Sequence, residues 1–385
     1  MDLELTTEQE LIRDTARQFA KRELAPTAAR RDAEDLFPER ELRALADIGL
    51  MGVNVPEEYG GMEAGVVAYS LAITELAKAC ASTTVAVAVT NMVAEVICHF
   101  GTDAQKKRYV EGLTGGELLT GSFALSEPQA GSDAASLSTR AERRDGGWVL
   151  NGTKQWITSG DKSGVTVVWA KTDPEVGAKG ISCFLVEQGV EGFSVGRHED
   201  KLGLRGSSTV SLTFEDCFLP DDAVLGGLGD GFKLAMIALD GGRIGVGSQA
   251  LGIGLAALEE GRRYALDRRQ FGKPIASFQG LQWMLADTAT ELDAASLLVL
   301  RAASLKEKKR PFTLEASMGK VYASEAAWRA CDRMLQIHGG YGYVKEYPIE
   351  RLLRDARVTR IYEGTSEVQR IVIARELLKR QDRLL

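Results

Sequence analysis

The sequence predicts an α+β fold in which a β-domain separates two helical domains. Apolar residues recur at helical spacing through residues 1–117 and again, in longer segments, through 226–385. Between them, residues 118–225 contain short β-branched and aromatic runs bounded by turn residues. The 385 residues are enough for two or three domains and for an internal cavity.

The composition argues against several classes of function. The formal net charge is −7, so electrostatics give no reason to expect nucleic acid or an anionic membrane as the main partner. The five cysteines form no C-x-x-C pair and the three histidines are far apart, so we expect no metal site. The opening residues MDLELTTEQE lack an apolar signal region, which predicts a cytoplasmic protein of bacterial type, with a mature mitochondrial matrix form as the alternative.

Helix signals are clear in the N-terminal block. Thr7–Glu10 and Thr102–Gln105 both have the spacing of a capping box, and Pro38 and Gly49 are placed to open and end a further helix. The most apolar window, residues 79–100, also contains several polar residues. We therefore expect a buried helix hairpin there instead of a membrane span.

The middle block carries strand and hairpin signals. Asn151-Gly152 lies between two apolar runs at 148–150 and 154–158, which predicts a hairpin with a type I′ turn. Further strands are expected at 165–170, 181–186 and 210–214. This block should form a β-barrel or a β-sandwich.

The C-terminal block predicts helices at 231–266, 279–308, 313–337, 349–357 and 367–380. Glycine and alanine are dense between 239 and 257, which allows close helix packing or leaves room for a ligand. Two G-x-G-x-x-A matches lie there, at 245–250 and 252–257. Because both lie inside a continuous helical pattern, we reject a dinucleotide-binding loop.

The segment RIYEGTSEVQR (360–370) raises a specific question about Glu363. Ser366–Gln369 has capping-box spacing ahead of a last helix, which accounts for the polar residues from 365 to 369. It does not account for Glu363, which lies before the cap. This carboxylate is either a surface charge or a reactive group held in a loop.

Five motifs in order resemble those of the acyl-CoA dehydrogenases: FALSEPQAGSD (123–133), WIT (156–158), DRRQFG (267–272), QIHGGYGY (336–343) and IYEGTSEVQR (361–370). Singly, each has an ordinary structural interpretation, such as a turn, a core tryptophan or a glycine helix stop. NVPEEYGG (54–61) and EDKLGLRGSS (199–208) are similar to family segments too. LDGGRIGVGSQALG (239–252) and RDARVTRIYEGTSE (354–367) look most like the short-chain, butyryl-type branch.

The resemblance implies an N-terminal helical domain (1–117), a middle β-domain (118–225) and a C-terminal four-helix bundle (226–385). It implies FAD-dependent oxidation of short- to medium-chain saturated acyl-CoA to trans-2-enoyl-CoA, as in fatty acid β-oxidation. Electrons would pass to electron-transferring flavoprotein. The family is usually a homotetramer, a dimer of dimers, without nucleic-acid partners or membrane insertion.

The resemblance also implies roles for individual residues. Glu363 would remove the α-proton while the β-hydride passes to flavin N5. The flavin would be bound by Phe123, Leu125, Ser126, Gly131, Ser132, Trp156, Ile157, Thr158, Arg268, Phe271, Gln279, Gln336, Ile337, Gly339, Gly340, Thr365, Ser366 and Glu367. The acyl-CoA would contact Ser132, Asp240, Gly241, Gly242, Arg243 and Gly364.

Two absences narrow the subtype. The isovaleryl and long-chain branches place their base at the position of Gly242, where glycine cannot serve. No arginine occurs between Ala79 and Gly101 to bind a distal carboxylate, which disfavours a dicarboxylate substrate. An acyl-CoA oxidase and a branched-chain dehydrogenase remain as alternatives, as does, with less support, a non-enzymatic DNA-associated relative.

Overall fold

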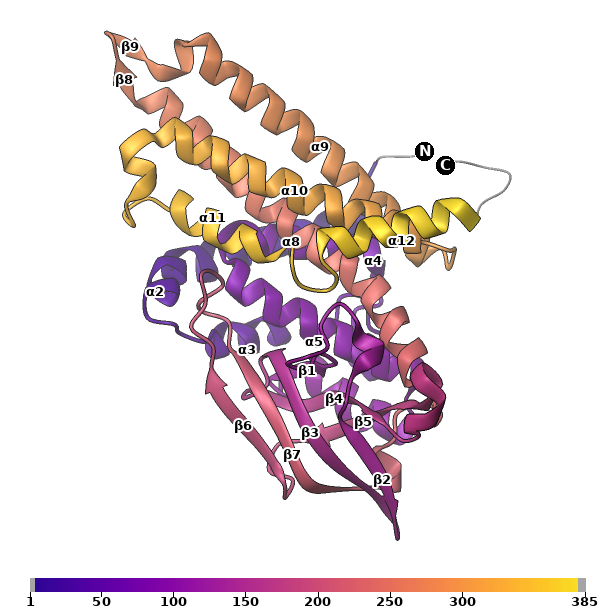
Figure 1. Ribbon diagram of the computed structural model, residues 1–385. Helices are drawn as coiled ribbons and strands as arrows, with labels where there is room; N and C mark the ends of the chain where they lie inside the picture. Colours follow the sequence, from indigo (N-terminus) through magenta and orange to yellow (C-terminus); the bar gives the residue numbers. More distant parts are fainter. Residues whose placement is uncertain (1–3, 380–385) are drawn as a thin grey trace.

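The computed structural model describes residues 4–379 and has the predicted order of helices, sheet and helices (Figure 1). In the view of Figure 1 the long C-terminal helices lie above, the sheet lies below, and helix α5 lies between them. Helix α5 packs on both β1 and α8, so it joins the two larger parts of the molecule. The loop that carries Glu363 lies between α11 and α12 in the helical part.

The N-terminal helices are α1 Thr7–Phe19, α2 Ala28–Ala33, α3 Glu39–Asp47, α4 Gly65–Ala79, α5 Ala81–Phe100, α6 Asp103–Gln105 and α7 Glu111–Thr114. The capping box at Thr102 and Gln105 is confirmed. The one predicted at Thr7–Glu10 is wrong by one residue. Thr6 caps α1, and its hydroxyl accepts a hydrogen bond from the Gln9 N–H at 3.2 Å.

The apolar window at 79–100 is one helix and not the predicted hairpin. A break in extended backbone at Cys80 precedes α5, which then runs unbroken for 20 residues. By length and composition α5 is able to cross a membrane, but 89% of its apolar window is buried inside the protein. Its apolar character is therefore explained by its central position between sheet and bundle.

The β-domain is one seven-stranded sheet in the order β1-β4-β2-β3-β7-β6, with β5 paired to β4. The strands are β1 Thr120–Ala124, β2 Arg140–Arg144, β3 Gly147–Thr158, β4 Ser163–Lys171, β5 Ile181–Glu187, β6 Phe193–His198 and β7 Thr209–Pro220. Side chains from β1, β3, β4, β5 and β7 meet in one apolar core, so the sheet curls around it. The three strands predicted downstream of residue 160 are confirmed.

The hairpin predicted at Asn151-Gly152 is wrong, because both residues lie inside the single strand β3. The ladder to β7 is irregular there, and the Asn151 side chain exchanges hydrogen bonds with Asp216 on β7. A side chain at Gly152 would overlap Thr139. The two residues therefore form a bulge, while the true hairpin joins β2 to β3 through Asp145 and Gly146.

The C-terminal helices are α8 Gly231–Asp267, α9 Gln279–Glu307, α10 Thr313–His338, α11 Ile349–Val358 and α12 Ser366–Lys379. A short hairpin, β8 Arg269–Gln270 and β9 Lys273–Pro274, joins α8 to α9. All five helices agree with prediction, although the predicted end of the last one, residue 380, lies outside the described residues. Helices α8, α9 and α10 run along one another, with α12 beside α10 (Figure 1).

The glycines of α8 are positions of close helix packing. A side chain at Gly252 would overlap the Thr74 carbonyl of α4, and one at Gly254 would stand 3.2 Å from Ala327 Cα of α10. The rejection of a dinucleotide loop is thus confirmed, since both motifs lie within one continuous helix.

Candidate active site

Glu363 lies in the turn between α11 and α12, in a backbone conformation that only a small part of the chain adopts. Its φ is 49°, and that of Gly364 is 92°, so two consecutive residues have left-handed backbone. The residue is partly buried, and its carboxylate oxygen Oε2 is buried without a hydrogen-bond partner. Burial raises the pKa of Glu363 to about 7, while the positive charges of Lys320 and Arg243 act in the opposite direction.

The turn is held through its carbonyl groups. The Gln369 side-chain amide donates to the Glu363 carbonyl at 3.2 Å and to the Gly364 carbonyl at 3.1 Å. The Lys320 ammonium donates to the same Gly364 carbonyl at 2.7 Å. These contacts hold the main chain of the turn and thereby restrict the position of the Glu363 carboxylate.

The predicted capping box at Ser366–Gln369 is wrong, because the cap lies one residue earlier. The Thr365 hydroxyl accepts a hydrogen bond from the Val368 N–H at 3.2 Å, and Ser366 is already the first helical residue. The Ser366 hydroxyl is buried without a partner. Gln369 is consequently free to turn back toward the loop instead of completing a cap.

A face of α8 without side chains lies opposite the carboxylate. A Cβ on Gly242 would overlap Glu363 Oε2 and would stand 2.9 Å from Met92 Sδ on α5. One turn further, a Cβ on Gly245 would stand 2.7 Å from the Tyr69 hydroxyl. Of the glycines predicted to contact substrate, Gly242 faces the candidate base and Gly364 follows it in the turn, whereas Gly241 faces Lys306 and Glu95.

Polar groups border this glycine face. Arg243 is buried and forms an ion pair with Asp240, whose other oxygen accepts from the Thr313 hydroxyl at 2.5 Å. On the other side of α8, the Lys306 ammonium lies against Gly241 and binds both oxygens of Glu95 at 2.8 Å. The site is thus closed by paired charges and not by apolar side chains alone.

The segment 123–133 leaves β1 as a loop organised around Glu127. The Glu127 carboxylate, 2% exposed, accepts from the main-chain N–H groups of Ser138 at 2.6 Å and Thr139 at 2.9 Å. It also forms an ion pair of 2.7 Å with the buried Lys154 of β3. These bonds hold the pair ionised at neutral pH, with the pKa of Glu127 lowered to about 2, although burial lowers the pKa of Lys154 to about 8.

The predicted flavin residues of this loop lie close to those of β3. The Ser126 carbonyl accepts from the Gln155 N–H at 2.9 Å, next to Trp156. Trp156 is 61% exposed and has a φ of 64°, so it is not a core residue. Ile157 is buried, and the Thr158 carbonyl accepts from the Ser122 hydroxyl at 2.9 Å. An exposed indole held at an irregularity in the strand is a suitable surface for stacking a flat ring.

A second group of predicted residues lines a cavity of about 680 Å³ at the far end of the bundle. It brings the DRRQFG and QIHGG motifs together, about 65 residues apart in sequence. The predicted residues in its wall are Arg268, Phe271, Gln336, Ile337, Gly339 and Gly340. Gln279 begins α9 nearby in sequence but does not line this cavity. Phe271 is 92% exposed, so the cavity is open to solvent on that side.

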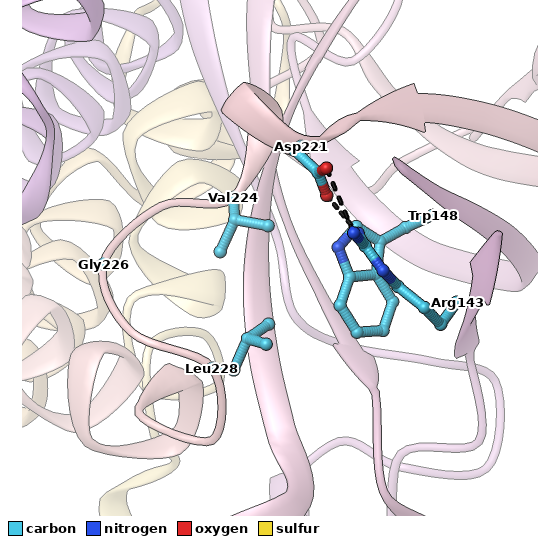
Figure 2. Close-up of a pocket in the computed structure, with 6 residues that line it drawn as sticks. All are labelled: Arg143, Trp148, Asp221, Val224, Gly226 and Leu228. Atoms are coloured by element: carbon cyan, nitrogen blue, oxygen red, sulfur yellow. Dashed lines mark hydrogen bonds and ion pairs between the residues drawn. The ribbon is translucent and has the colours of Figure 1, made fainter. Parts of the chain in front are cut away.

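A different pocket, of about 460 Å³, lies on the β-domain (Figure 2). The Arg143 guanidinium forms an ion pair with Asp221 and lies over the Trp148 ring, 5.3 Å from its centroid. Val224 and Leu228 face this group across the pocket (Figure 2). None of the residues predicted for the site line it.

The residues present fit FAD. The loop after β1 offers main-chain groups, and a Cβ on Gly131 would meet nothing within 4 Å, which leaves room for a ligand at that loop. Trp156 offers an exposed ring, and the Ser366 hydroxyl is buried without a partner. The far cavity offers glycine main chain beside an arginine, which suits a phosphate.

Comparison with known proteins decides the family. The profiles described as acyl-CoA dehydrogenase N-terminal, middle and C-terminal domains match residues 6–117, 122–217 and 229–378. The chain belongs to the acyl-CoA dehydrogenase family. It is an oxidoreductase that uses FAD to dehydrogenate acyl-CoA, and its relatives include short-chain acyl-CoA dehydrogenases.

Two curated relatives are each 48% identical to the chain. One is acryloyl-CoA reductase (NADH) of Anaerotignum propionicum, with 99% of this chain and 97% of the relative covered. The other is mouse mitochondrial short-chain specific acyl-CoA dehydrogenase, with 98% and 92% covered. Two solved structures superpose with TM-scores of 0.97. They are butyryl-CoA dehydrogenase from Megasphaera elsdenii (42% identity, 98% and 100% covered) and a chain in a structure of the electron transferring flavoprotein of Acidaminococcus fermentans (44%, 99% and 100%).

Sequence analysis missed several residues that shape this acyl-CoA dehydrogenase site. Lys320, Gln369 and the Glu127–Lys154 pair were not predicted to hold the two loops. The signal for Lys320 was available, since it lies on the buried face of α10 among alanine, serine and glycine. A lysine in such a place calls for a partner.

Proposed function

We propose that Glu363 is the base that removes the α-proton of a short- to medium-chain acyl-CoA. The observation that carries this is the Glu363 carboxylate itself, partly buried, with one oxygen unpartnered and aimed at the side-chain-free face of Gly242. A carboxylate with a pKa of about 7 is a stronger base than a carboxylate in water. At neutral pH about half of the protein molecules still carry Glu363 in the ionised form.

The turn also offers a hydrogen-bond donor for the thioester carbonyl, which is the second requirement of the reaction. Negative charge develops on the thioester carbonyl as the α-proton leaves, and it needs hydrogen-bond donors. We assign one donor to the main-chain N–H of Glu363, whose unusual backbone is held by Gln369 and Lys320. Glycine is required at 364, because a side chain there would overlap the Gln369 amide that holds the turn.

FAD, when bound, accepts the hydride that leaves the β-carbon. We propose that the loop after β1 binds the flavin through Phe123, Leu125, Ser126, Gly131 and Ser132, the last also near CoA. Trp156, Ile157 and Thr158 would hold the ring, and Thr365 to Glu367 would complete the pocket. The adenine and pyrophosphate end would bind at Arg268, Phe271, Gln279, Gln336, Ile337, Gly339 and Gly340.

We propose a homotetramer, a dimer of dimers, in the cytoplasm. Large apolar side chains are exposed around the outer end of the bundle, including Phe271 at 92%, Tyr343 at 87% and Trp283 at 61%. Such a set is typical of a surface that another chain covers. The three domains would then be 1–117, 118–225 and 226–385, with the tetramer built by the last. We propose electron-transferring flavoprotein as the electron acceptor.

The direction of the reaction in the cell is open to a second candidate. The relative named acryloyl-CoA reductase (NADH) supports a physiological role in reducing a 2-enoyl-CoA. In that direction Glu363 would deliver a proton to the α-carbon, and the reduced flavin would supply hydride to the β-carbon. NADH-driven reduction of acryloyl-CoA in the presence of electron-transferring flavoprotein would favour this candidate.

The dehydrogenase role is tested by anaerobic flavin bleaching with a series of saturated acyl-CoA esters. Loss of the yellow colour with butyryl- or hexanoyl-CoA is expected. Bleaching by isovaleryl-CoA in preference to these would indicate a branched-chain enzyme. Hydrogen peroxide formed at the rate of turnover in air would indicate an oxidase.

A further inference from the structure

Lys320 is a fully buried lysine whose positive charge has no role so far in the proposed reaction. It lies in the first third of α10 with 0% of its surface exposed. Its ammonium donates to the Gly364 carbonyl at 2.7 Å. Among residues 4–379, none of the ion pairs within 4.0 Å involves it. A lysine is almost never fully buried without a function or a partner, and this one is directed at the turn that carries Glu363.

The charged groups around Lys320 come from four elements. Glu363 from the turn is the acid with the strongest influence, and Arg243 of α8 opposes it as a like charge. Glu325 of α10 has its own partner, Arg360, at 3.0 Å, and Glu367 of α12 is exposed. Burial lowers the pKa of Lys320 to about 8, so it is largely protonated at neutral pH.

The groups around Glu363 are similarly few. Lys320 and Arg243 are the two cations that stabilise its charge. Tyr69 of α4 and Tyr362 of the turn face it as neutral phenols, whose pKa values burial and the Glu363 charge raise. Arg243 is already engaged by Asp240 and by the Ser317 hydroxyl at 3.3 Å. Of these two cations, Lys320 is therefore the one whose charge is not neutralised by an ion pair with a carboxylate.

We propose that Lys320 is a positioning residue for the dehydrogenation, which ties the Gly364 carbonyl and supplies uncompensated positive charge behind the Glu363 carboxylate. The inference rests on the proposed role of Glu363. Lys320 does not touch the substrate in this account. It acts on the base through the turn, by fixing its backbone and by favouring its ionised form.

Two substitutions remove the charge, one of them together with the hydrogen-bond donor. Lys320→Met removes both the donor and the charge, whereas Lys320→Gln keeps an amide donor and removes the charge. Without the charge, the Glu363 carboxyl stays protonated to higher pH. We expect the midpoint of the pH profile for flavin reduction by butyryl-CoA to rise by about one unit or more in both variants. Flavin reduction at pH 7 should slow about tenfold and recover in part at higher pH.

Lys78→Met is the control. Lys78 lies on α4, is paired with Glu75 and takes no part in the site, so its removal should leave the profile unchanged. FAD absorbance and circular dichroism establish that each variant is folded and loaded. Wild-type midpoints in both Lys320 variants would overturn the inference, as would slower reduction with an unmoved midpoint, which indicates a merely structural role.

Thermal unfolding gives an independent test for a variant too slow to assay. At pH 8 Lys320→Gln should destabilise the wild-type protein more than it destabilises Glu363→Gln, because only the former holds a charged partner. Equal destabilisation in the two backgrounds would overturn the inference. Flavin reduction at the normal rate in Glu363→Gln would refute the proposed function. Loss of flavin reduction in Glu363→Gln, together with a wild-type pH profile in the Lys320 variants, would refute only the role of Lys320.

Discussion

Glu363 and Gly242 face each other so closely that any side chain at 242 would overlap the Glu363 carboxylate. The two residues are 121 positions apart, one in a turn and the other in the first third of α8. Gly242 has no side chain, and Glu363 places its carboxylate in the space that a side chain at 242 would occupy. The structure thus agrees with the argument from the sequence, in which glycine at 242 cannot act as the base and Glu363 is left as the candidate.

Gly242→Ala tests that relationship. The added methyl group would displace the Glu363 carboxylate or Met92, and we expect flavin reduction by butyryl-CoA to slow at least tenfold while FAD stays bound. Gly247→Ala is the matched control on the same helix, where the new atom would stand 3.0 Å from a Val299 methyl group. A Gly242→Ala enzyme with normal reduction would show that the carboxylate has room to move without consequence.

The raised pKa of Glu363 predicts a pH-dependent stability. A carboxyl with a folded-state pKa of about 7 and an unfolded value near 4.5 favours its protonated form in the folded state. That stability is present below pH 4.5 and is lost as the pH rises to about 7. Glu363→Gln mimics the protonated form, so it should match the wild type at pH 4 and exceed it by ~1–3 kcal/mol at pH 8. Chemical denaturation at the two pH values measures this, and equal stabilities at pH 8 would refute the burial argument.

The Glu127–Lys154 pair should be required for the flavin loop. Glu127→Gln leaves a buried lysine without its counter-ion, which costs ~3–5 kcal/mol. We expect a lower melting temperature and easier release of FAD in urea, with partial recovery in the Glu127→Gln, Lys154→Met double variant. Glu34→Gln is the control, because its pair with Arg30 is exposed and worth less than ~1 kcal/mol. Unchanged FAD retention in Glu127→Gln would show that the pair serves the fold alone.

Phe271 tests the proposed tetramer and the far end of the flavin site together. Phe271→Ser removes an almost fully exposed ring from the lip of the far cavity, so we expect weaker FAD retention and a smaller assembly by light scattering. Leu228→Ser changes another exposed apolar residue, in the pocket of Figure 2, and should leave both unchanged. A wild-type mass for Phe271→Ser with normal FAD content would exclude this surface from both roles.

The order of domains and nearly all long helices could be predicted, because apolar periodicity is a local signal and these helices bury one face each. The incorrect predictions at Asn151-Gly152 and at two helix caps also rested on local sequence signals. Asn151-Gly152 is a strong turn signal, but pairing with β7 on one side and with β2 on the other keeps β3 extended through it. Thr6 and Thr365 each precede a second residue able to cap, and the sequence pattern does not decide between neighbours.

The residues of the candidate site also divide into those that the sequence indicated and those that it did not. Glu363 was singled out from the sequence because capping left it unexplained, and the family resemblance suggested a role for it. Gln369 was not found as a support of the turn because it was assigned to a helix cap, although the carbonyls it binds are only five and six residues away. Lys320 and the Glu95–Lys306 pair were not found, because each binds a residue far away in sequence. Their partners are known only once α5, α8, α9 and α10 are packed together.

Anaerobic flavin reduction in wild type and Glu363→Gln tests the central claim most directly. Both proteins should be yellow with equal FAD content, since Glu363 is proposed to act on the substrate and not to hold the cofactor. Butyryl-CoA should bleach the wild type within seconds, and should bleach Glu363→Gln at least a thousandfold more slowly, about 4 kcal/mol in activation free energy. Near-wild-type bleaching of Glu363→Gln, or no bleaching of the wild type by any saturated acyl-CoA from short to long, would contradict the account.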